Sequence, residues 1–524
     1  MTTDVETEKL VLIPLDERPV NVRYPAMLGA IAGVHVSLPP MSCLGYLRDP
    51  ADYTALVAWL RHEAQNARAA IVSADMMAFG NLINSRISNT SAAAAIGRLA
   101  VLAELNQHVP VRAFGLITRV ANANDCVEEP LYWLEWGKDA HRFAALTHRK
   151  MNGDGSLSER EQDELSKLDT LIPNEIRQDW LTRRLRNHIV SLSLIEMASR
   201  RDIASLLLTS DDTSSFGFPS RERDWLRSWP DIIGPDLQSR VSMHPGADEV
   251  GCALVAREIN TIKGRYPRVW VEWSNNAGAD LVAPYEDRPV RETVYGQIAA
   301  CGAVIALSAD QCDFVLGVVA PSPHLSDYRE TYMGEDRLLR TDEYLEFINR
   351  LGGLQGQLHP IAIADVAYPN GSDPLFIEML FASRAYLSPE TLCAYGAWNT
   401  AGNTVGTVVA HSVCSLYSEE SLSANAAHGM FLTHRFLEDY GYQSVVRRAA
   451  REYCLAQWGT RDPDPNNTDQ IHDVIAFVES GLAEQMNILR VHGIGTGFRL
   501  RPGSVRLPWN RLFEVDFDLN VIEG

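Results

Sequence analysis

Residues 203–212 read Ile-Ala-Ser-Leu-Leu-Leu-Thr-Ser-Asp-Asp, a short apolar run that ends in two adjacent carboxylates. A run of this length, closed by polar residues, is typical of a strand buried inside a parallel sheet. The pattern recurs along the chain, with helical stretches such as 53–66 and 91–107 between the runs. Strands that alternate with helices predict an α/β fold with a mainly parallel sheet. The other runs that predict strands are 10–15, 34–38, 70–74, 111–118, 240–243, 268–273, 313–320, 359–364 and 392–398.

We expect these strands to form a (β/α) barrel or a barrel-like parallel sheet that occupies residues 8–410 as a catalytic region. Within it, the charged segment 128–201 contains several helical stretches and is predicted to be a helical insertion between two strands. The pattern changes in residues 411–524, where apolar residues three and four apart predict helices. The chain is therefore expected to end in a mainly helical C-terminal region that closes with short strands.

Charge and composition exclude several classes of partner. The 524 residues include 47 Lys and Arg against 67 Asp and Glu, which gives a formal net charge of −20. Such a surface repels nucleic-acid phosphates and anionic lipids, so we expect neither partner. No apolar run approaches the ~18 residues of a membrane span. The polar start of the chain and eight scattered cysteines without a Cys-x-x-Cys pair favour a reduced, cytoplasmic protein.

Signature motifs for common cofactors are missing from the sequence. It has no Gly-x-Gly-x-x-Gly after a strand, no phosphate-binding loop motif, no His-Glu-x-x-His and no Gly-x-Ser-x-Gly. We therefore expect no nucleotide cofactor and no resident metal.

Polar side chains follow the predicted strands at the point where each strand ends. In parallel α/β proteins, ligands bind at the carboxyl ends of the strands, so these side chains are expected to gather in one polar pocket. Turns and helix caps use the same residue types and are the alternative explanation for each position. The candidate residues are Asp16, Arg18, Asp75, Asn81, Arg86, Arg119, Asp211, Asp212, Asp248, Asp365, Asn370, Asp373, Trp398, Asn399 and Asn403.

The adjacent pair Asp211 and Asp212 is the strongest candidate for catalysis. Two carboxylates near one buried site cannot both ionise cheaply, so one is expected to have a raised pKa and to serve as a general acid. Glycosidic bond hydrolysis needs such a division of roles. Two alternatives stay open: hard oxygen ligands for a divalent metal, or one capping and one exposed aspartate. Further catalytic candidates are Asp75, Asp248 and Asp365.

Residues suited to sugar recognition accompany these carboxylates. The face of Trp398 can pack on a pyranose ring, and the amides of Asn399 and Asn403 can both donate to and accept from hydroxyl groups. The arginines can clamp a substrate carboxylate or pair with the nearby aspartates. The substrate-binding set predicted here is Asp16, Arg18, Asn81, Arg86, Arg119, Asn370, Asp373, Trp398, Asn399 and Asn403.

Six segments follow one another in a characteristic order: PLDERPVN (14–21), SADMMAFG (73–80), SDDT (210–213), GADEV (246–250), ADVAYPNGSD (364–373) and AWNTAGN (397–403). Together they resemble a bacterial family of unknown function, numbered four-one-two-seven, over nearly the whole chain. This resemblance implies no particular reaction.

A second, local resemblance concerns residues 206–212, Leu-Leu-Leu-Thr-Ser-Asp-Asp, with Gly217 and the later pair Trp398-Asn399. It is similar to family-eighty-four glycoside hydrolases, the N-acetylglucosaminidases of the hyaluronidase and O-GlcNAcase type. The resemblance implies that Asp211 orients the acetamido group of the substrate, that Asp212 is the general acid–base, and that Asn399 contacts the sugar.

These observations together predict a glycoside hydrolase that acts on a small oligosaccharide or amino-sugar glycoside in carbohydrate metabolism. A divalent-metal-dependent hydrolase and a non-enzymatic carbohydrate-binding protein are the alternatives. The expected partner is a small carbohydrate, and a homo-oligomer is left open.

Overall fold

The computed structural model of the protein describes residues 8–151, 157–321 and 335–522. Two compact units can be distinguished, and each is described by itself. The first comprises residues up to 22 with 35–254 and 285–288, and the second comprises residues 23–34, 255–284 and the chain from 289 onward. The helices α1 (Pro19–Ile31) and α11 (Val250–Lys263) are divided between the two units.

The first unit is built on a six-stranded sheet with the order β2-β1-β3-β4-β5-β6, in which every neighbouring pair is parallel. Between β1 and β3 the chain reverses the direction in which it adds strands, which is the switch point where doubly wound sheets bind ligands. The strands are β1 (Lys9–Ile13), β2 (His35–Ser37), β3 (Ala69–Ser73), β4 (Val111–Ile117), β5 (Ser205–Ser210) and β6 (Val241–Pro245).

The second unit repeats this topology. Its sheet has the order β11-β10-β9-β7-β8, again with parallel neighbours throughout. Read from β8, this is the same 2-1-3-4-5 order as in the first sheet. The strands are β7 (Arg268–Trp273), β8 (Val304–Ile305), β9 (Phe314–Val319), β10 (Ile361–Asp365) and β11 (Ala394–Gly396).

The expected α/β class with parallel strands is confirmed, but closure into a barrel is not confirmed. The described parallel strands fall into two sheets with separate edges, β2 and β6 in the first sheet and β11 and β8 in the second. Local apolar runs predict where strands lie, whereas strand order depends on pairing between distant segments. A barrel and two doubly wound sheets therefore produce the same local pattern.

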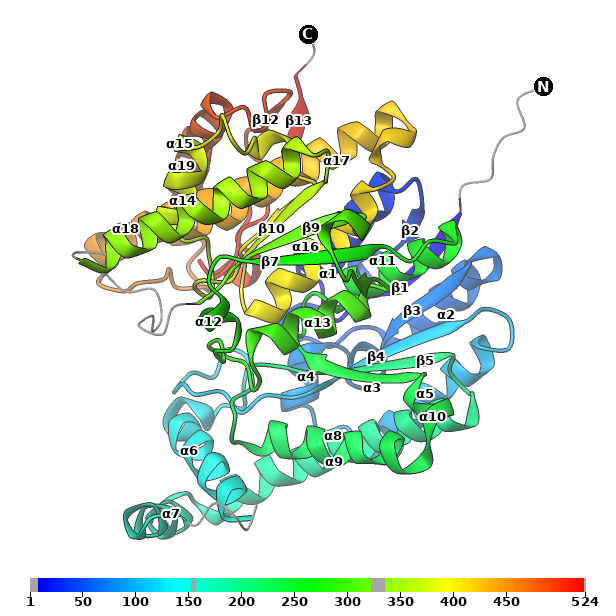
Figure 1. The fold of residues 1–524 in the computed structure, drawn as a ribbon. Coiled ribbons are helices and arrows are strands. Elements are labelled where there is room, and N and C mark those ends of the chain that lie inside the picture. The colour runs from blue at the N-terminus through cyan, green and yellow to red at the C-terminus, as the bar shows by residue number, and fades with distance from the viewer. Residues whose placement is uncertain (1–7, 152–156, 322–334, 523–524) are drawn as a thin grey trace. The chain divides into compact units, whose positions relative to one another are not determined.

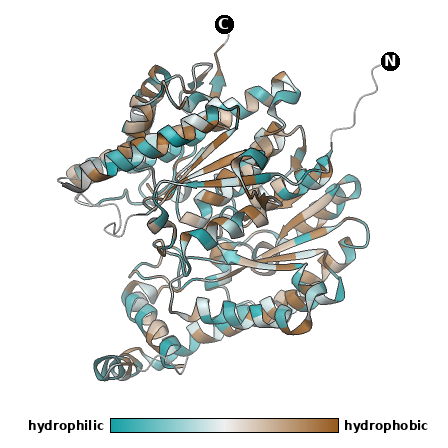
Figure 2. Ribbon diagram, in the orientation of Figure 1, coloured by the Kyte–Doolittle hydropathy of each residue, from teal (hydrophilic) through white to brown (hydrophobic). Residues whose placement is uncertain are grey.

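Buried apolar side chains explain why the central strands form. Each residue of β3 and β10 is buried, as expected for strands covered on both faces. Figure 2 shows hydrophobic residues concentrated on the strands and a mixture of hydrophilic and hydrophobic residues along the helices. Helices of the first unit are α2 (Tyr53–Glu63), α3 (Ala74–Phe79), α4 (Leu82–Ile87), α5 (Ala92–Leu105), α9 (Phe218–Ile233) and α10 (Pro235–Gln238).

Three helices, α6 (Trp133–Met151), α7 (Glu159–Leu171) and α8 (Asn174–Arg200), lie between β4 and β5, where the sequence predicts an insertion. Part of this segment has a small core of its own, in which Trp133 and Trp180 meet edge to face at 5.5 Å between ring centroids.

Helices dominate the end of the second unit. The boundary expected at residue 410 falls inside α16, so a separate C-terminal domain stays a prediction. The helices are α12 (Asn276–Ala279), α13 (Val290–Ala300), α14 (Glu335–Gly356), α15 (Pro374–Ala382), α16 (Ala401–Ser415), α17 (Leu422–Arg435), α18 (Arg447–Trp458) and α19 (Thr468–Val491), with a π-helical segment η6 (Phe436–Val446). Two short antiparallel strands, β12 (Phe498–Leu500) and β13 (Leu519–Val521), follow.

Within the described ranges, no helix has both the length and the apolar character required to cross a membrane.

Candidate active site

Polar residues lie at the carboxyl ends of the strands of the first sheet. Asp16 follows β1, Asp75 follows β3, Arg119 follows β4, and Asp248 follows β6. The Asp211-Asp212 pair follows β5 directly. Because neighbouring strands are parallel, their carboxyl ends lie on the same side of the sheet, and these residues lie along that side.

Asp211 is held by an arginine from the neighbouring helix α4. The Nη2 atom of Arg86 donates to Oδ2 of Asp211 across 2.5 Å. Both side chains are buried, with 3% and 7% of their surface exposed. A buried carboxylate needs such a partner, because leaving it unpaired in a low-dielectric setting is costly.

Asp212 differs from its neighbour in both exposure and backbone. Its side chain is 30% exposed and accepts a hydrogen bond from Nη1 of Arg119 across 2.8 Å. Its φ of +36° lies in the left-handed region, which is uncommon for a residue other than glycine and recurs at functional sites. Partial burial and the negative charge of Asp211 raise the pKa of Asp212 to about 6, although Arg119 opposes this shift.

Two glutamates that the sequence analysis did not single out complete this cluster. Glu128 accepts from both arginines, at 2.9 Å from Nη1 of Arg86 and 3.1 Å from Nη2 of Arg119. Glu129 accepts from Nε of Arg119 at 2.9 Å. We define the carboxylate–arginine cluster as Arg86, Arg119, Glu128, Glu129, Asp211 and Asp212. It holds four acidic and two basic side chains.

Asp75 lies beside this cluster at the start of α3. Its Oδ2 atom accepts a hydrogen bond from the backbone N–H of Leu116 at 2.8 Å. Burial, reinforced by the charge of Asp211, raises the pKa of Asp75 to about 7. Asp75 therefore favours its neutral form more strongly than an ordinary aspartate does.

A second charged group joins the ends of β1 and β6. Arg18 donates to Asp16 from Nη2 at 2.7 Å and to Asp248 from the same atom at 2.5 Å. Asn21 also donates to Asp16, at 2.8 Å. Burial raises the pKa of Asp248, and the charge of Asp16 adds to the effect. The tight turn before Asp248 requires Gly246, whose φ is +130° and where a Cβ atom would lie 2.0 Å from Glu249.

Asn81 is fully buried, and its side chain forms hydrogen bonds with the backbone around it. Its Oδ1 atom caps α4 by accepting from the N–H of Asn84, and its Nδ2 atom donates to the carbonyls of Leu47 and Asp49. These contacts position the helix that carries Arg86. Direct contact of Asn81 with a substrate stays a prediction.

The remaining candidates belong to the second unit. Asp365 ends β10 and accepts from the N–H groups of Ala367 and Asp373. Burial and the nearby Asp373 raise the pKa of Asp365 to about 8. Asp373 caps α15, and its Oδ2 atom accepts from the hydroxyl of Tyr344 at 2.5 Å and from Arg340 at 3.1 Å.

Three of the predicted substrate-binding residues, Asn370, Trp398 and Asn399, lie on the loops after β10 and β11. Trp398 is buried and meets Phe513 edge to face at 6.1 Å between ring centroids. Asn370 and Asn399 both have positive φ, +60° and +66°, and the N–H of Asn370 donates to the carbonyl of Asn399. Asn403 is buried in the first turn of α16.

A buried ion pair in the second unit also escaped the sequence analysis. Nη2 of Arg435 lies 2.6 Å from Oδ2 of Asp439, and this same oxygen accepts from the N–H of Ala397 at 2.5 Å. Burial raises the pKa of Asp439 to about 7. Because the two residues are four apart in a helical segment, their pattern resembles that of an ordinary surface pair, and only the structure reveals the burial.

The predicted site residues therefore divide into two groups, one in each unit, and their convergence in one pocket stays a prediction. The group of the first unit is Asp16, Arg18, Asp75, Asn81, Arg86, Arg119, Asp211, Asp212 and Asp248. The group of the second unit is Asp365, Asn370, Asp373, Trp398, Asn399 and Asn403. In the part of the chain that the structure describes, no three His, Cys, Asp or Glu side chains are grouped so that they could hold a metal ion.

Comparison with known proteins identifies the family. A sequence model described as "Protein of unknown function (DUF4127)" matches residues 10–518. The chain belongs to this family. The resemblance noted from its six segments is confirmed, whereas the likeness to family-eighty-four glycoside hydrolases stays a prediction.

A comparison with curated proteins finds no match. Among solved structures, the chain is similar to a native Bacteroidetes-affiliated GH5 cellulase linked with a polysaccharide utilization locus, at 11% identity and a TM-score of 0.18. That match covers 79% of this chain and 98% of the cellulase chain.

Proposed function

We propose that this DUF4127 protein is a hydrolase in which Asp212 is the general acid–base, acting on the glycosidic bond of a small oligosaccharide or amino sugar. One observation carries the proposal: Asp212 is the most exposed carboxyl of the charged cluster, at 30% against 15% or less for the other three, and its pKa is raised to about 6. A general acid works best when its pKa lies near the working pH.

The cluster supports different roles for the two adjacent aspartates. Asp211 is buried against Arg86, so its carboxylate is fixed in position and its charge acts on Asp212. Asp212 has solvent access and accepts a hydrogen bond from Arg119. In glycosidases, two carboxyl groups in contrasting environments have different pKa values, so one serves as the acid and the other stays charged.

Hydroxyl groups beside the pair support a hydroxyl-rich substrate. The side-chain oxygens of Ser210 and Thr213 are buried and have no hydrogen-bond partner among the described residues. Buried hydroxyls normally have partners, and a bound ligand is one way to supply them. The local resemblance to N-acetylglucosaminidases at 206–212 supports the same class of substrate.

In the proposed reaction, protonated Asp212 donates its proton to the glycosidic oxygen as the bond from that oxygen to the anomeric carbon breaks. The Asp212 carboxylate then accepts a proton from the water that adds to the anomeric carbon. Arg119 keeps the carboxyl in place through both steps, and proton transfer of this kind contributes roughly 100-fold to 10,000-fold in rate.

A panel of methylumbelliferyl glycosides, including the N-acetylglucosaminide, tests this function. We expect the wild-type protein to hydrolyse at least one of them, and Asp212→Asn to lower turnover about 100-fold or more. Asp231→Asn, which changes an exposed aspartate on α9, is the matched control and should retain wild-type turnover. Full activity of Asp212→Asn would refute the assignment, and a ligand-induced rise in Tm without turnover would instead favour a sugar-binding protein.

We also propose that the protein works in the cytoplasm. All eight cysteines are free in the structure, which suits a reducing compartment.

A further inference from the structure

Arg447, at the start of α18, is a buried arginine that forms no ion pair with a carboxylate of the described residues. Its Nη1 atom donates to the amide oxygen of Gln443 at 2.8 Å, and its Cζ atom lies 5.2 Å from the ring centroid of Phe513. Its Nε atom is buried and has no hydrogen-bond partner within the part of the chain that the structure describes. A buried guanidinium whose only hydrogen-bond partner there is a neutral amide is costly, which points to an anion from outside the chain.

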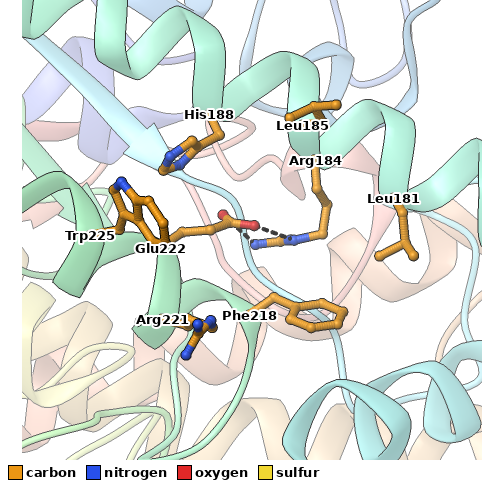
Figure 3. A pocket seen from close by; sticks show the side chains of 8 residues that line it. All are labelled: Leu181, Arg184, Leu185, His188, Phe218, Arg221, Glu222 and Trp225. Carbon is orange, nitrogen blue, oxygen red and sulfur yellow. Dashed lines mark hydrogen bonds and ion pairs between the residues drawn. The ribbon is translucent and has the colours of Figure 1, made fainter. Parts of the chain in front are cut away.

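Other buried arginines of this chain have partners that compensate them. In the groove between α8 and α9, Arg184 donates to Glu222 from Nε at 2.9 Å and from Nη2 at 2.8 Å (Figure 3). Arg186 has no ion pair with a described carboxylate, but it donates to several backbone carbonyls, including that of Ser88 at 2.6 Å. Arg447 has neither kind of compensation among the described residues.

The charges around Arg447 leave its own charge without a counter-ion. Arg451, one turn further along α18, lies 3.9 Å from Asp462, and Arg511 lies 3.7 Å from Glu514, so each of these two arginines has a carboxylate. Burial, reinforced by the charge of Arg451, lowers the pKa of Arg447 to about 10, and Arg447 is still a cation at neutral pH. An anion with one negative charge balances this arrangement, and a carboxylate suits the planar guanidinium.

Two more buried polar atoms lack partners among the described residues, on the loops that follow β10 and β11. Trp398 is 1% exposed and meets Phe513 edge to face at 6.1 Å between ring centroids, and its Nε1 atom has no acceptor. The Oδ1 atom of Asn370 is also buried and has no donor. The N–H of Asn370 donates to the carbonyl of Asn399 at 3.0 Å, which joins the two loops. An unused donor and an unused acceptor suit hydroxyl groups, which can both accept and donate.

We propose that the second unit binds a small polyhydroxylated carboxylate here, with its carboxylate on Arg447 and its hydroxyl groups on Nε1 of Trp398 and Oδ1 of Asn370. Arg447 and Trp398 both lie against Phe513, so one ligand of monosaccharide size can reach both side chains. Phe513 is partly exposed, which gives solvent access to this ring. Ligands of parallel α/β proteins bind at the carboxyl ends of the strands, where the loops after β10 and β11 lie. Binding within the second unit does not depend on the hydrolysis proposed for Asp212.

Calorimetric titration of the full-length protein with glucuronate, galacturonate and gluconate tests the proposal. Glucose, galactose and glucitol are the matched uncharged ligands. We expect at least one of the acids to show saturable binding that is about tenfold or more tighter than that of its uncharged counterpart, because the uncharged ligand lacks the charged hydrogen bond to Arg447.

Substitutions then locate the site. Arg447→Met should weaken binding of that acid about tenfold or more, because the charged contact is lost. Arg448→Met changes the next arginine along the helix, whose side chain is 58% exposed, and should alter binding less than about twofold. Trp398→Phe retains an aromatic ring but removes the Nε1 donor, and should weaken binding of the acid roughly two- to tenfold.

Lack of saturable binding by all three acids would overturn the proposal, and so would equal affinity for each acid and its uncharged counterpart. Unchanged affinity in Arg447→Met would exclude Arg447 as the carboxylate site. The comparison of charged with uncharged ligands uses only the wild-type protein, and Trp398→Phe tests the location independently if Arg447→Met fails to fold.

Discussion

Arg119 donates a hydrogen bond from Nη1 to Oδ2 of Asp212 across 2.8 Å, and this contact lowers the pKa of Asp212, which its other surroundings raise. Partial burial and the neighbouring Asp211 raise the pKa of Asp212 to about 6, while Arg119 and Arg86 lower it. The protonation of Asp212 is therefore a balance between named neighbours, and substitutions can move it in either direction.

Substitutions of these neighbours should shift the pH profile of hydrolysis in opposite directions. The acid form of Asp212 is lost above its pKa, so kcat/KM should fall as the pH rises above about 6. Asp211→Asn removes a negative charge and should move this fall to lower pH, whereas Arg119→Met should move it to higher pH. Arg119→Lys retains the charge and is the control. Identical profiles in all four proteins would show that Asp212 does not control the reaction.

Asp75 should make the folded protein less stable as the pH rises. Its pKa is about 7 in the folded protein and about 3.9 in an unfolded chain, so its stabilising contribution is complete below about pH 4 and is lost as the pH rises through 7. Asp75→Asn retains an acceptor for the N–H of Leu116 but cannot ionise. Relative to wild type, its Tm should therefore rise at about pH 8, by an amount equivalent to roughly 1–4 kcal/mol, and the difference should shrink toward about pH 4.

Asp231→Asn is the comparison for this measurement, because it removes an exposed carboxylate outside the cluster. A Tm difference for Asp75→Asn that does not vary with pH would contradict the raised pKa of Asp75.

Strand positions could be predicted from the sequence because buried strands of parallel sheets are short, continuous apolar runs. β7 (Arg268–Trp273) has the predicted bounds, and most other strands differ by one or two residues at their ends. β8 (Val304–Ile305) was missed, since it has only two residues, both exposed, at the edge of the sheet. The division into two sheets could not be predicted, because strand order depends on hydrogen bonds between distant segments.

The buried ion pair of the second unit should matter greatly for stability. Arg435→Met leaves the carboxylate of Asp439 buried with one fewer cationic partner, so unfolding should become easier by about 3–5 kcal/mol. The double variant Arg435→Met with Asp439→Leu removes both charges and should recover part of this loss. Denaturant unfolding measures both effects. A single variant as stable as the wild type would show that the pair contributes little.

Removal of divalent metals separates the proposed mechanism from the metal-dependent alternative. Acid–base catalysis by Asp212 needs no metal, so hydrolysis should continue unchanged after dialysis against excess EDTA. Loss of activity that returns when a divalent cation is added would favour metal-dependent hydrolysis instead.

Most candidate site residues could be recognised from the sequence because they closely follow a strand. Asp211, Asp212 and Arg119 were found in this way, and in the structure Arg119 donates a hydrogen bond to Asp212 while Asp211 accepts one from Arg86. Glu128 and Glu129 were not found, because they lie about ten residues beyond β4 in a charged segment that carries no strand signal.

The dependence of Asp212→Asn on the leaving group tests the central claim most directly. A general acid is needed most when the departing oxygen is strongly basic and least when the leaving group departs without protonation. We predict that Asp212→Asn lowers kcat/KM about 100-fold or more on an alkyl glycoside, and far less on the dinitrophenyl glycoside of the same sugar. Equal losses on both substrates, or no loss on either, would contradict the assignment of Asp212 as the general acid.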